Sequence, residues 1–274
     1  MTGGKTLALA MSLIVTLMSS GALGEEELGN PRSSYGLGSA KYLEGRNVLY
    51  SLFVDTPDAS WQQEDKEQAL KKLQIATGYI EDRAEEYGVD AELICDWQEN
   101  INLMGQTEVD FVIRDDEEFV DRLDEEIAYW VEHTVDYEEL KKNSDAAGAA
   151  LLVFVNNPSV SYAIVFDGAD NPKESVVMFS GEAPAVYAHE IMHLFGAHDL
   201  YEEAEFTREV TAYVKQNYPL EIMYRVTDEQ GNSYDEKIVN TLSPITAYHL
   251  GWVDEVKELE MFPQLIRKNK YDSK

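Results

Sequence analysis

Three of the five histidines of this chain fall in one short segment, which reads AHEIMHLFGAHDLY over residues 188–201. His189 and His193 are four residues apart, so on a helix both imidazoles leave the same face one turn apart. At that spacing two ring nitrogens can bind one zinc ion. Glu190 leaves the helix at a neighbouring angle, which keeps its carboxylate outside the ligand set but close to the metal. These residues predict hydrolysis of a carbonyl compound by a zinc-activated water, with Glu190 as the general base.

A third ligand is expected from beyond this helix. Gly196 follows His193 by three residues, where a helix can end and the chain can turn sharply without a Cβ penalty. His198 and Asp199 come next, nine and ten residues after His189. Imidazole is the more usual zinc ligand and aspartate an accepted one, so the chemistry of the two side chains leaves both open.

Four glutamates further along are a weaker alternative for the third ligand: Glu202, Glu203, Glu205 and Glu209. Phe206, Val210 and Val214 recur among them at helical spacing, which is typical of an ordinary amphipathic helix. The acidic side of such a helix faces water. We therefore rank these glutamates below Asp199.

The segment as a whole resembles HExxHxxGxxD, the long zinc-binding motif of the metzincin clan of metallopeptidases, in the variant that ends in Asp. The resemblance implies that His189, His193 and Asp199 bind Zn²⁺ and that Glu190 is the catalytic residue. His198 then lies outside the ligand set.

Two further motifs carry the same resemblance. Residues 220–224, LEIMY, resemble the Met-turn, in which Met223 packs beneath the ligands and does not coordinate the metal. Residues 242–252, LSPITAYHLGW, together with HLFGAHDLY, are similar to secreted bacterial metallopeptidases of the immune inhibitor A type. Arg225 departs from the pattern, because clan members commonly have a tyrosine two residues after this methionine. The residue that stabilises the oxyanion is therefore left open.

The hydrophobic pattern predicts the elements that position these motifs. Strand-like runs occupy residues 47–54, 151–155, 162–166 and 176–179. Helical patterns occupy residues 60–88, with a capping box at Ser60 and Gln63, then 119–130, 183–195 and 243–252. With the resemblance, this order predicts an α/β (α+β), metzincin-like fold: a twisted, mostly parallel sheet with backing helices, an active-site helix and a helical C-terminal lobe. An edge strand at residues 162–166 would hold an extended peptide by backbone pairing.

The N-terminal part predicts export. Lys5, an apolar run and a small-residue site at residues 22–24 are typical of a signal peptide over residues 1–24. The apolar run is short for a bilayer span of about 20 residues, which favours cleavage over a retained anchor. Residues 25–46 are rich in Gly, Ser and charge and predict a flexible lead-in or short pro-segment. Residues 47–274 are then one catalytic domain with two lobes, about 47–196 and 197–274.

The charge balance restricts the partners. The 274 residues contain 22 Lys and Arg against 52 Asp and Glu, which gives a formal net charge of −30 and a pI near 4.3. Such a surface repels phosphate backbones and anionic lipids, so neither nucleic acid nor a membrane is expected as a partner. Cys95 is the only cysteine, which excludes an internal disulfide.

These observations predict a monomeric, secreted zinc endopeptidase with peptide or protein substrates. The alternative is a catalytically degenerate, zinc-binding extracellular binding protein of the same fold. Residues 226–240, which are predicted to form a hairpin with its tip at residues 230–232, lie in a loop near the cleft.

Overall fold

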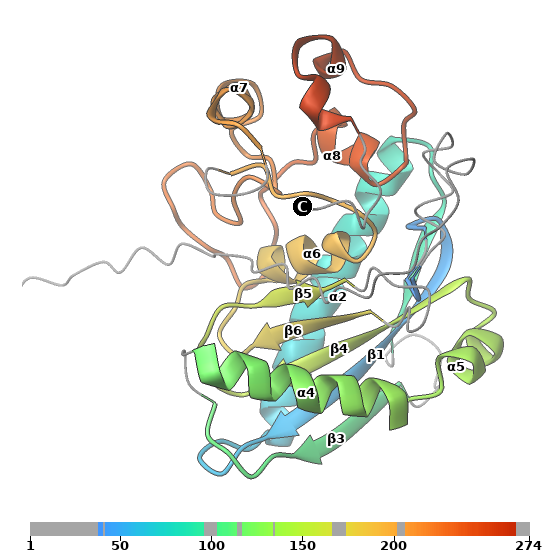
Figure 1. Ribbon diagram of the computed structural model, residues 1–274, viewed down its shortest axis with the longest axis vertical. Helices are drawn as coiled ribbons and strands as arrows, with labels where there is room; N and C mark the ends of the chain where they lie inside the picture. Colours follow the sequence, from blue (N-terminus) through green and yellow to red (C-terminus); the bar gives the residue numbers. More distant parts are fainter. Residues whose placement is uncertain are drawn as a thin grey trace, which may run out of the picture.

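The computed structural model describes residues 38–40, 42–95, 103–113, 117–133, 135–165, 174–201 and 206–266, with side chains in the helix at 117–133 described from Arg122 onward. Within these residues, helices and one sheet form a mixed α/β structure (Figure 1). Along the chain the elements are β1 (Gly45–Asp55), α2 (Gln63–Glu86), β2 (Ala91–Ile94), β3 (Met104–Glu108), α4 (Glu117–His133), α5 (Tyr137–Ser144), β4 (Gly148–Val155), β5 (Tyr162–Ile164), β6 (Ser175–Phe179), α6 (Pro184–His193), α7 (Arg208–Asn217), α8 (Pro244–His249), α9 (Glu258–Met261) and the 3₁₀ helix η1 (Pro263–Leu265).

The sheet is mostly parallel, as predicted. Its strand order is β2-β1-β4-β6-β5, with β3 also paired to β1. Strand β1 pairs in parallel with β2, β3 and β4, and β4 pairs in parallel with β6. Strand β5 at the edge is antiparallel to β6. All eight residues of the central strand β4 are buried, as expected for a parallel strand covered on both faces.

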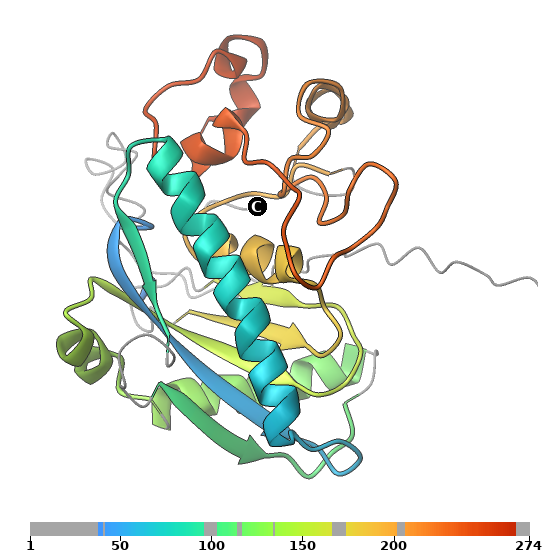
Figure 2. The same cartoon turned by 180° about the vertical axis from the view of Figure 1, so that it is seen from behind.

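Helices cover both faces of the sheet. Leu152 and Phe154 of β4 belong to the core cluster that includes α2 and α6, whereas Leu151 and Val153 belong to the cluster that includes α4. This alternation is the two-residue period of a strand. Helix α2 crosses the sheet on the face seen in Figure 2, with α6 packed beside it, and α4 lies on the opposite face (Figure 1).

Several predicted boundaries are corrected by the structure. Strand β1 begins at Gly45 instead of Asn47. Helix α2 begins at Gln63 with Gln62 as its N-cap, and the backbone N–H of Gln62 donates to Asp65 Oδ2 at 3.3 Å, so the predicted cap at Ser60 is wrong. The third position of the helix is thus Asp65 instead of Gln63. The negative carboxylate of Asp65 interacts favourably with the positive end of the helix dipole, whereas the amide of Gln63 is neutral. The short strands β2 and β3 and helix α5 were not predicted.

The part of the chain after α6 lies beyond one edge of the sheet (Figure 1). It contains the short helices α7, α8, α9 and η1, but most of its described residues lie in turns and irregular segments, so the predicted helical lobe is only partly helical. Ser243 caps α8, and its hydroxyl accepts from Thr246 N at 3.4 Å, as the Ser-Pro sequence predicts. Residues 226–240 contain no strand, so the predicted hairpin is wrong. Asp228 instead holds a compact turn through the backbone N–H groups of Gln230 and Asn232.

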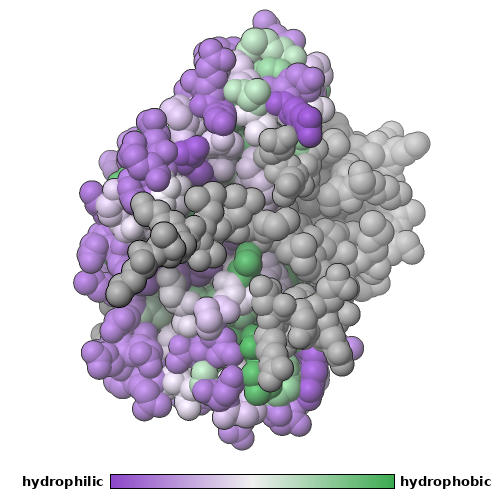
Figure 3. Space-filling view, turned by 90° about the vertical axis from the view of Figure 1, so that its left-hand side faces the viewer, coloured by the Kyte–Doolittle hydropathy of each residue, from purple (hydrophilic) through white to green (hydrophobic). Residues whose placement is uncertain are grey.

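Among the described residues, no helix combines the length and the hydropathy that a membrane crossing requires. On the face in Figure 3 hydrophilic side chains dominate the described surface, with smaller hydrophobic areas between them. The signal peptide predicted for residues 1–24 lies outside the described residues and stays a prediction.

Candidate metal centre

Helix α6 carries both predicted histidine ligands. It begins with Pro184 in its first turn, and all ten of its residues are buried between α2, the sheet and the C-terminal segments. His189 and His193 leave the same face, and their Nε2 atoms lie 3.2 Å apart. The four-residue spacing has therefore brought the two imidazoles together as predicted.

Carbonyl groups fix the protonation of both rings. Nδ1 of His189 lies 3.0 Å from the carbonyl oxygen of Ile222, and Nδ1 of His193 lies 2.8 Å from that of Ala197. A carbonyl only accepts, so each Nδ1 carries the hydrogen. In the neutral imidazole each Nε2 then carries a lone pair that can bind a metal.

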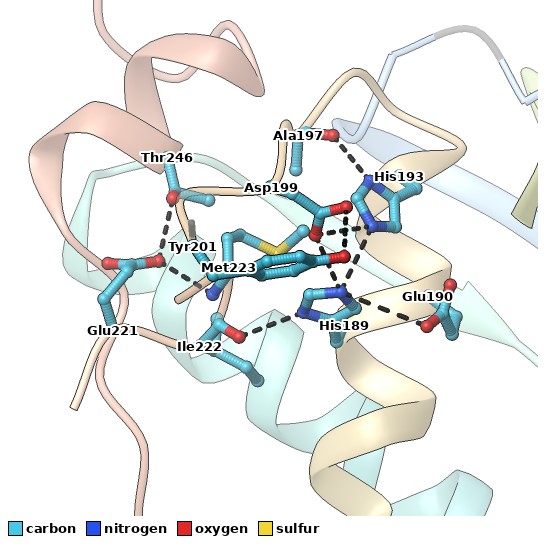
Figure 4. A network of polar contacts seen from close by, with 10 residues as sticks. All are labelled: His189, Glu190, His193, Ala197, Asp199, Tyr201, Glu221, Ile222, Met223 and Thr246. Atoms are coloured by element: carbon cyan, nitrogen blue, oxygen red, sulfur yellow. Dashed lines mark hydrogen bonds and ion pairs between the residues drawn. The ribbon is translucent and has the colours of Figure 1, made fainter. Parts of the chain in front are cut away.

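The turn after α6 brings Asp199 to the same point. Gly196 has a φ of +97°, a left-handed conformation that glycine adopts without strain. Asp199 Oδ1 lies 3.1 Å from Nε2 of His189 and 3.3 Å from Nε2 of His193. The three atoms form a triangle with edges of 3.1, 3.2 and 3.3 Å (Figure 4).

This triangle has the size that zinc requires. A tetrahedral ion with bonds of about 2.0 Å has ligand–ligand edges of about 3.3 Å. With both rings protonated at Nδ1 only, the buried Oδ1 of Asp199 has no hydrogen-bond donor among the described residues. Three acceptor atoms facing one another at such distances repel each other unless a cation lies between them. Two imidazoles and one carboxylate are a common zinc donor set.

The electrostatics of Asp199 point the same way. Burial by itself raises its pKa. When the imidazoles are also protonated at Nε2, the positive charge of His193, hydrogen bonds from both histidines and the charge of His189 outweigh burial and hold the pKa well below its usual range. The carboxylate is thus ionised at neutral pH. It stabilises positive charge here, whether carried by imidazole protons or by a metal ion.

Glu190 is buried beside the triangle rather than in it. Its Oε1 lies 4.0 Å from His189 Nε2, farther than any edge of the triangle. With His189 and His193 it forms a group of potential metal ligands whose atoms lie within 4.8 Å of one another. Glu190 thus lies beside the candidate ligands, and its role as the general base stays a prediction.

His198 packs against aromatic rings instead of joining the histidine pair. Its ring packs edge-on against His249, with centroids 4.9 Å apart, and against Phe206 at 5.9 Å. Of the rival glutamates, Glu209 is exposed in the first turn of α7, and Glu202, Glu203 and Glu205 lie outside the described residues. Asp199 is thus the carboxylate that the structure brings to the two histidines.

The segment that resembles a Met-turn packs against α6. Met223 is fully buried, and its carbonyl oxygen accepts from Leu200 N at 2.8 Å. Its neighbour Ile222 supplies the carbonyl that holds His189. This one turn therefore supports both a histidine and the segment that contains Asp199.

Sequence reasoning missed two residues of this network. Tyr201 donates a hydrogen bond from its hydroxyl to Asp199 Oδ2 at 2.9 Å. Glu221 is fully buried and accepts from Met223 N at 3.3 Å, from the Thr246 hydroxyl at 2.8 Å and from Ser243 N. The two-residue distance between Asp199 and Tyr201 puts the phenol close to the carboxylate along the chain, but this spacing alone does not predict their hydrogen bond. Nothing in the local sequence marks Glu221 as buried.

No protein-family model matches this chain, and no curated protein matches it either. Among solved structures it is similar to the crystal structure of metalloproteinase-II from Bacteroides fragilis, with 14% sequence identity and a TM-score of 0.39. The similarity covers 82% of this chain and 61% of that one, so the chain spans less than two thirds of the length of its structural neighbour.

Proposed function

We propose that this protein is an exported, zinc-dependent endopeptidase of the metzincin type. The observation that carries the proposal is the triangle of His189 Nε2, His193 Nε2 and Asp199 Oδ1, with edges of 3.1 to 3.3 Å. These three residues would hold the zinc. When bound, zinc polarises a carbonyl and makes water more acidic.

Glu190 is proposed as the general base. Its carboxylate is buried next to the triangle, where it can accept a proton from the attacking water without being a ligand itself. The water oxygen forms a bond to the carbonyl carbon, and Glu190 then gives the proton to the nitrogen as the C–N bond breaks. The products are a carboxylic acid and an amine.

Strand β5 is proposed to hold the substrate. It is the last strand at its edge of the sheet among the described residues, and its partner β6 lies on the other side. An extended peptide added along such an edge is held by main-chain hydrogen bonds, which suits many different sequences. Peptides and proteins are therefore the proposed substrates.

The test combines metal analysis with casein hydrolysis by the purified protein and three variants. Glu190→Ala should keep its zinc and lose activity roughly 10²–10⁴-fold, because only the proton transfer is removed. Asp199→Ala should lose zinc and activity together, whereas His198→Ala should keep both.

Two results would contradict the proposal. Full activity of Glu190→Ala would exclude its role as the base, and loss of zinc in His198→Ala alone would exclude Asp199 as the third ligand. Bound zinc with no hydrolysis by the unmodified protein would favour the alternative, a degenerate zinc-binding extracellular protein. Export is tested separately by N-terminal sequencing of the mature protein, which should begin at Glu25.

A further inference from the structure

Asp199 has two oxygens with different surroundings, and Tyr201 accounts for the difference. We propose that Tyr201 is a positioning residue of the metal site, which makes Asp199 a ligand through one oxygen only. This inference rests on the proposed zinc site.

The contacts divide the carboxylate of Asp199 into two roles. Oδ2 accepts the hydrogen bond from the Tyr201 hydroxyl at 2.9 Å. Oδ1 is the atom that faces Nε2 of His189 at 3.1 Å and Nε2 of His193 at 3.3 Å (Figure 4). The phenol therefore engages Oδ2, whereas Oδ1 is the oxygen for which the short distances to both histidines are found.

The backbone between the two residues fixes this arrangement. Leu200 is fully buried, and its N–H donates to the carbonyl oxygen of Met223 at 2.8 Å. The side chains on either side of Leu200, Asp199 and Tyr201, are joined by the hydrogen bond from the phenol to Oδ2. The turn around Met223 thus presents the carboxylate and the phenol together.

One-oxygen binding matters because of the coordination number. A catalytic zinc site keeps three protein ligands and leaves one position for water or substrate. A carboxylate that binds through both oxygens would add a ligand and fill that position. A hydrogen bond from a hydroxyl to a carboxylate is among the stronger kinds, so the Tyr201 phenol can hold Oδ2 in place.

Loss of a group that orients a metal ligand typically weakens metal binding 10- to 100-fold. In Tyr201→Phe the ring stays and only the hydroxyl is lost. We expect the zinc dissociation constant of this variant, measured by competition with a chelator, to rise roughly 10- to 100-fold. We also expect the visible absorption of the Co²⁺-substituted variant to weaken, because these bands lose intensity when a fourth ligand is joined by a fifth.

Tyr213→Phe is the matched control. Its hydroxyl also donates to a buried carboxylate, Glu258 Oε1, at 3.0 Å, but at a point between α7 and α9 rather than at the metal site. This variant should keep the zinc affinity and the Co²⁺ spectrum of the unmodified protein. The melting temperature of both variants without metal reports any general loss of packing.

The outcomes separate this inference from the proposed function. If the unmodified protein binds no zinc, the proposed function fails and the inference fails with it. If it binds zinc and Tyr201→Phe matches it in affinity and Co²⁺ spectrum, the metal site stands and the role of Tyr201 is overturned. A lower melting temperature of Tyr201→Phe with an unchanged Co²⁺ spectrum would also overturn it, since that is what a purely structural residue would give.

Discussion

Replacement of Glu221 by alanine is expected to destabilise the protein and weaken metal binding at the same time. Glu221 is fully buried and receives the backbone N–H groups of Met223 and Ser243 and the hydroxyl of Thr246. It joins the Met223 turn to the first turn of α8. Ile222, which lies between Glu221 and Met223, supplies the carbonyl that orients His189.

The magnitude follows from the groups that lose their acceptor. A buried donor left unsatisfied costs about 1–3 kcal/mol. The two backbone N–H groups cannot turn away, so together they cost about 2–6 kcal/mol, whereas the Thr246 hydroxyl can rotate. Burial raises the pKa of Glu221 despite these bonds, which means that the folded state bears a desolvation cost that alanine removes. We therefore expect a loss of about 3 kcal/mol, which for a chain of this size lowers the melting temperature by roughly 6–12 °C.

The assay is urea unfolding in the presence of a chelator, followed by zinc affinity of the folded variant. Glu258→Ala is the control, because Glu258 is also a fully buried glutamate but accepts two hydroxyls, from Tyr213 at 3.0 Å and Tyr218 at 2.6 Å. It should lose less stability, since both hydroxyls can rotate toward water, and keep its zinc affinity. A loss below about 1 kcal/mol in Glu221→Ala, or equal zinc affinity in the two variants, would refute this reasoning.

Three further predictions concern the turn after α6, the loop at Asp228 and the surface charge. Gly196→Ala places a side chain at a φ of +97° and should cost about 1–2 kcal/mol, measured by urea unfolding; an unchanged midpoint would show that the turn relaxes. Hydrogen bonds from the side chain and backbone of Asn232, and then from Tyr234, lower the pKa of Asp228 to about 2. Because the folded pKa lies below the unfolded one, this carboxylate stabilises the fold above about pH 4, and that contribution is lost as the pH falls through about 2. In an NMR titration Tyr234→Phe should raise this pKa, and an unchanged value would exclude the phenol as a cause. With a net charge of −30, added salt should slow the cleavage of cationic peptides more than that of neutral ones, and equal slowing would separate the charge from function.

The parts of the fold that the sequence predicts are those with a long, regular hydrophobic pattern. The buried run at β4 depends only on one strand, and the four-residue spacing of His189 and His193 depends only on one helix. Both can therefore be recognised in the sequence alone. Gly88, with a φ of +74° after the end of α2, was predictable for the same reason. Local sequence is sufficient where a single helix or strand determines the outcome.

The parts that escape prediction depend on pairing between distant segments. Strands β2 and β3 are four and five residues long, and they exist because each pairs with one half of the long strand β1. Glu221 is buried where it accepts hydrogen bonds from Ser243 and Thr246, which lie 22 and 25 residues further along the chain. The hydrophobic pattern within a segment does not show which distant segment it will contact.

The positions of His198 and Asp199 show how the tertiary structure brings one of two neighbouring residues close to the histidine pair. Imidazole is the better zinc ligand in general, but Leu200 N is bonded to Met223 O, and this anchors the chain one residue after Asp199. His198 is thereby left to pack against His249 and Phe206. The same turn holds His189 through Ile222 O, so one short segment sets the direction of two of the three donor atoms. The three donor atoms come together only when α6 and the Met223 turn are in contact. Metal binding should therefore stabilise this contact more than it stabilises the helix or the turn by itself.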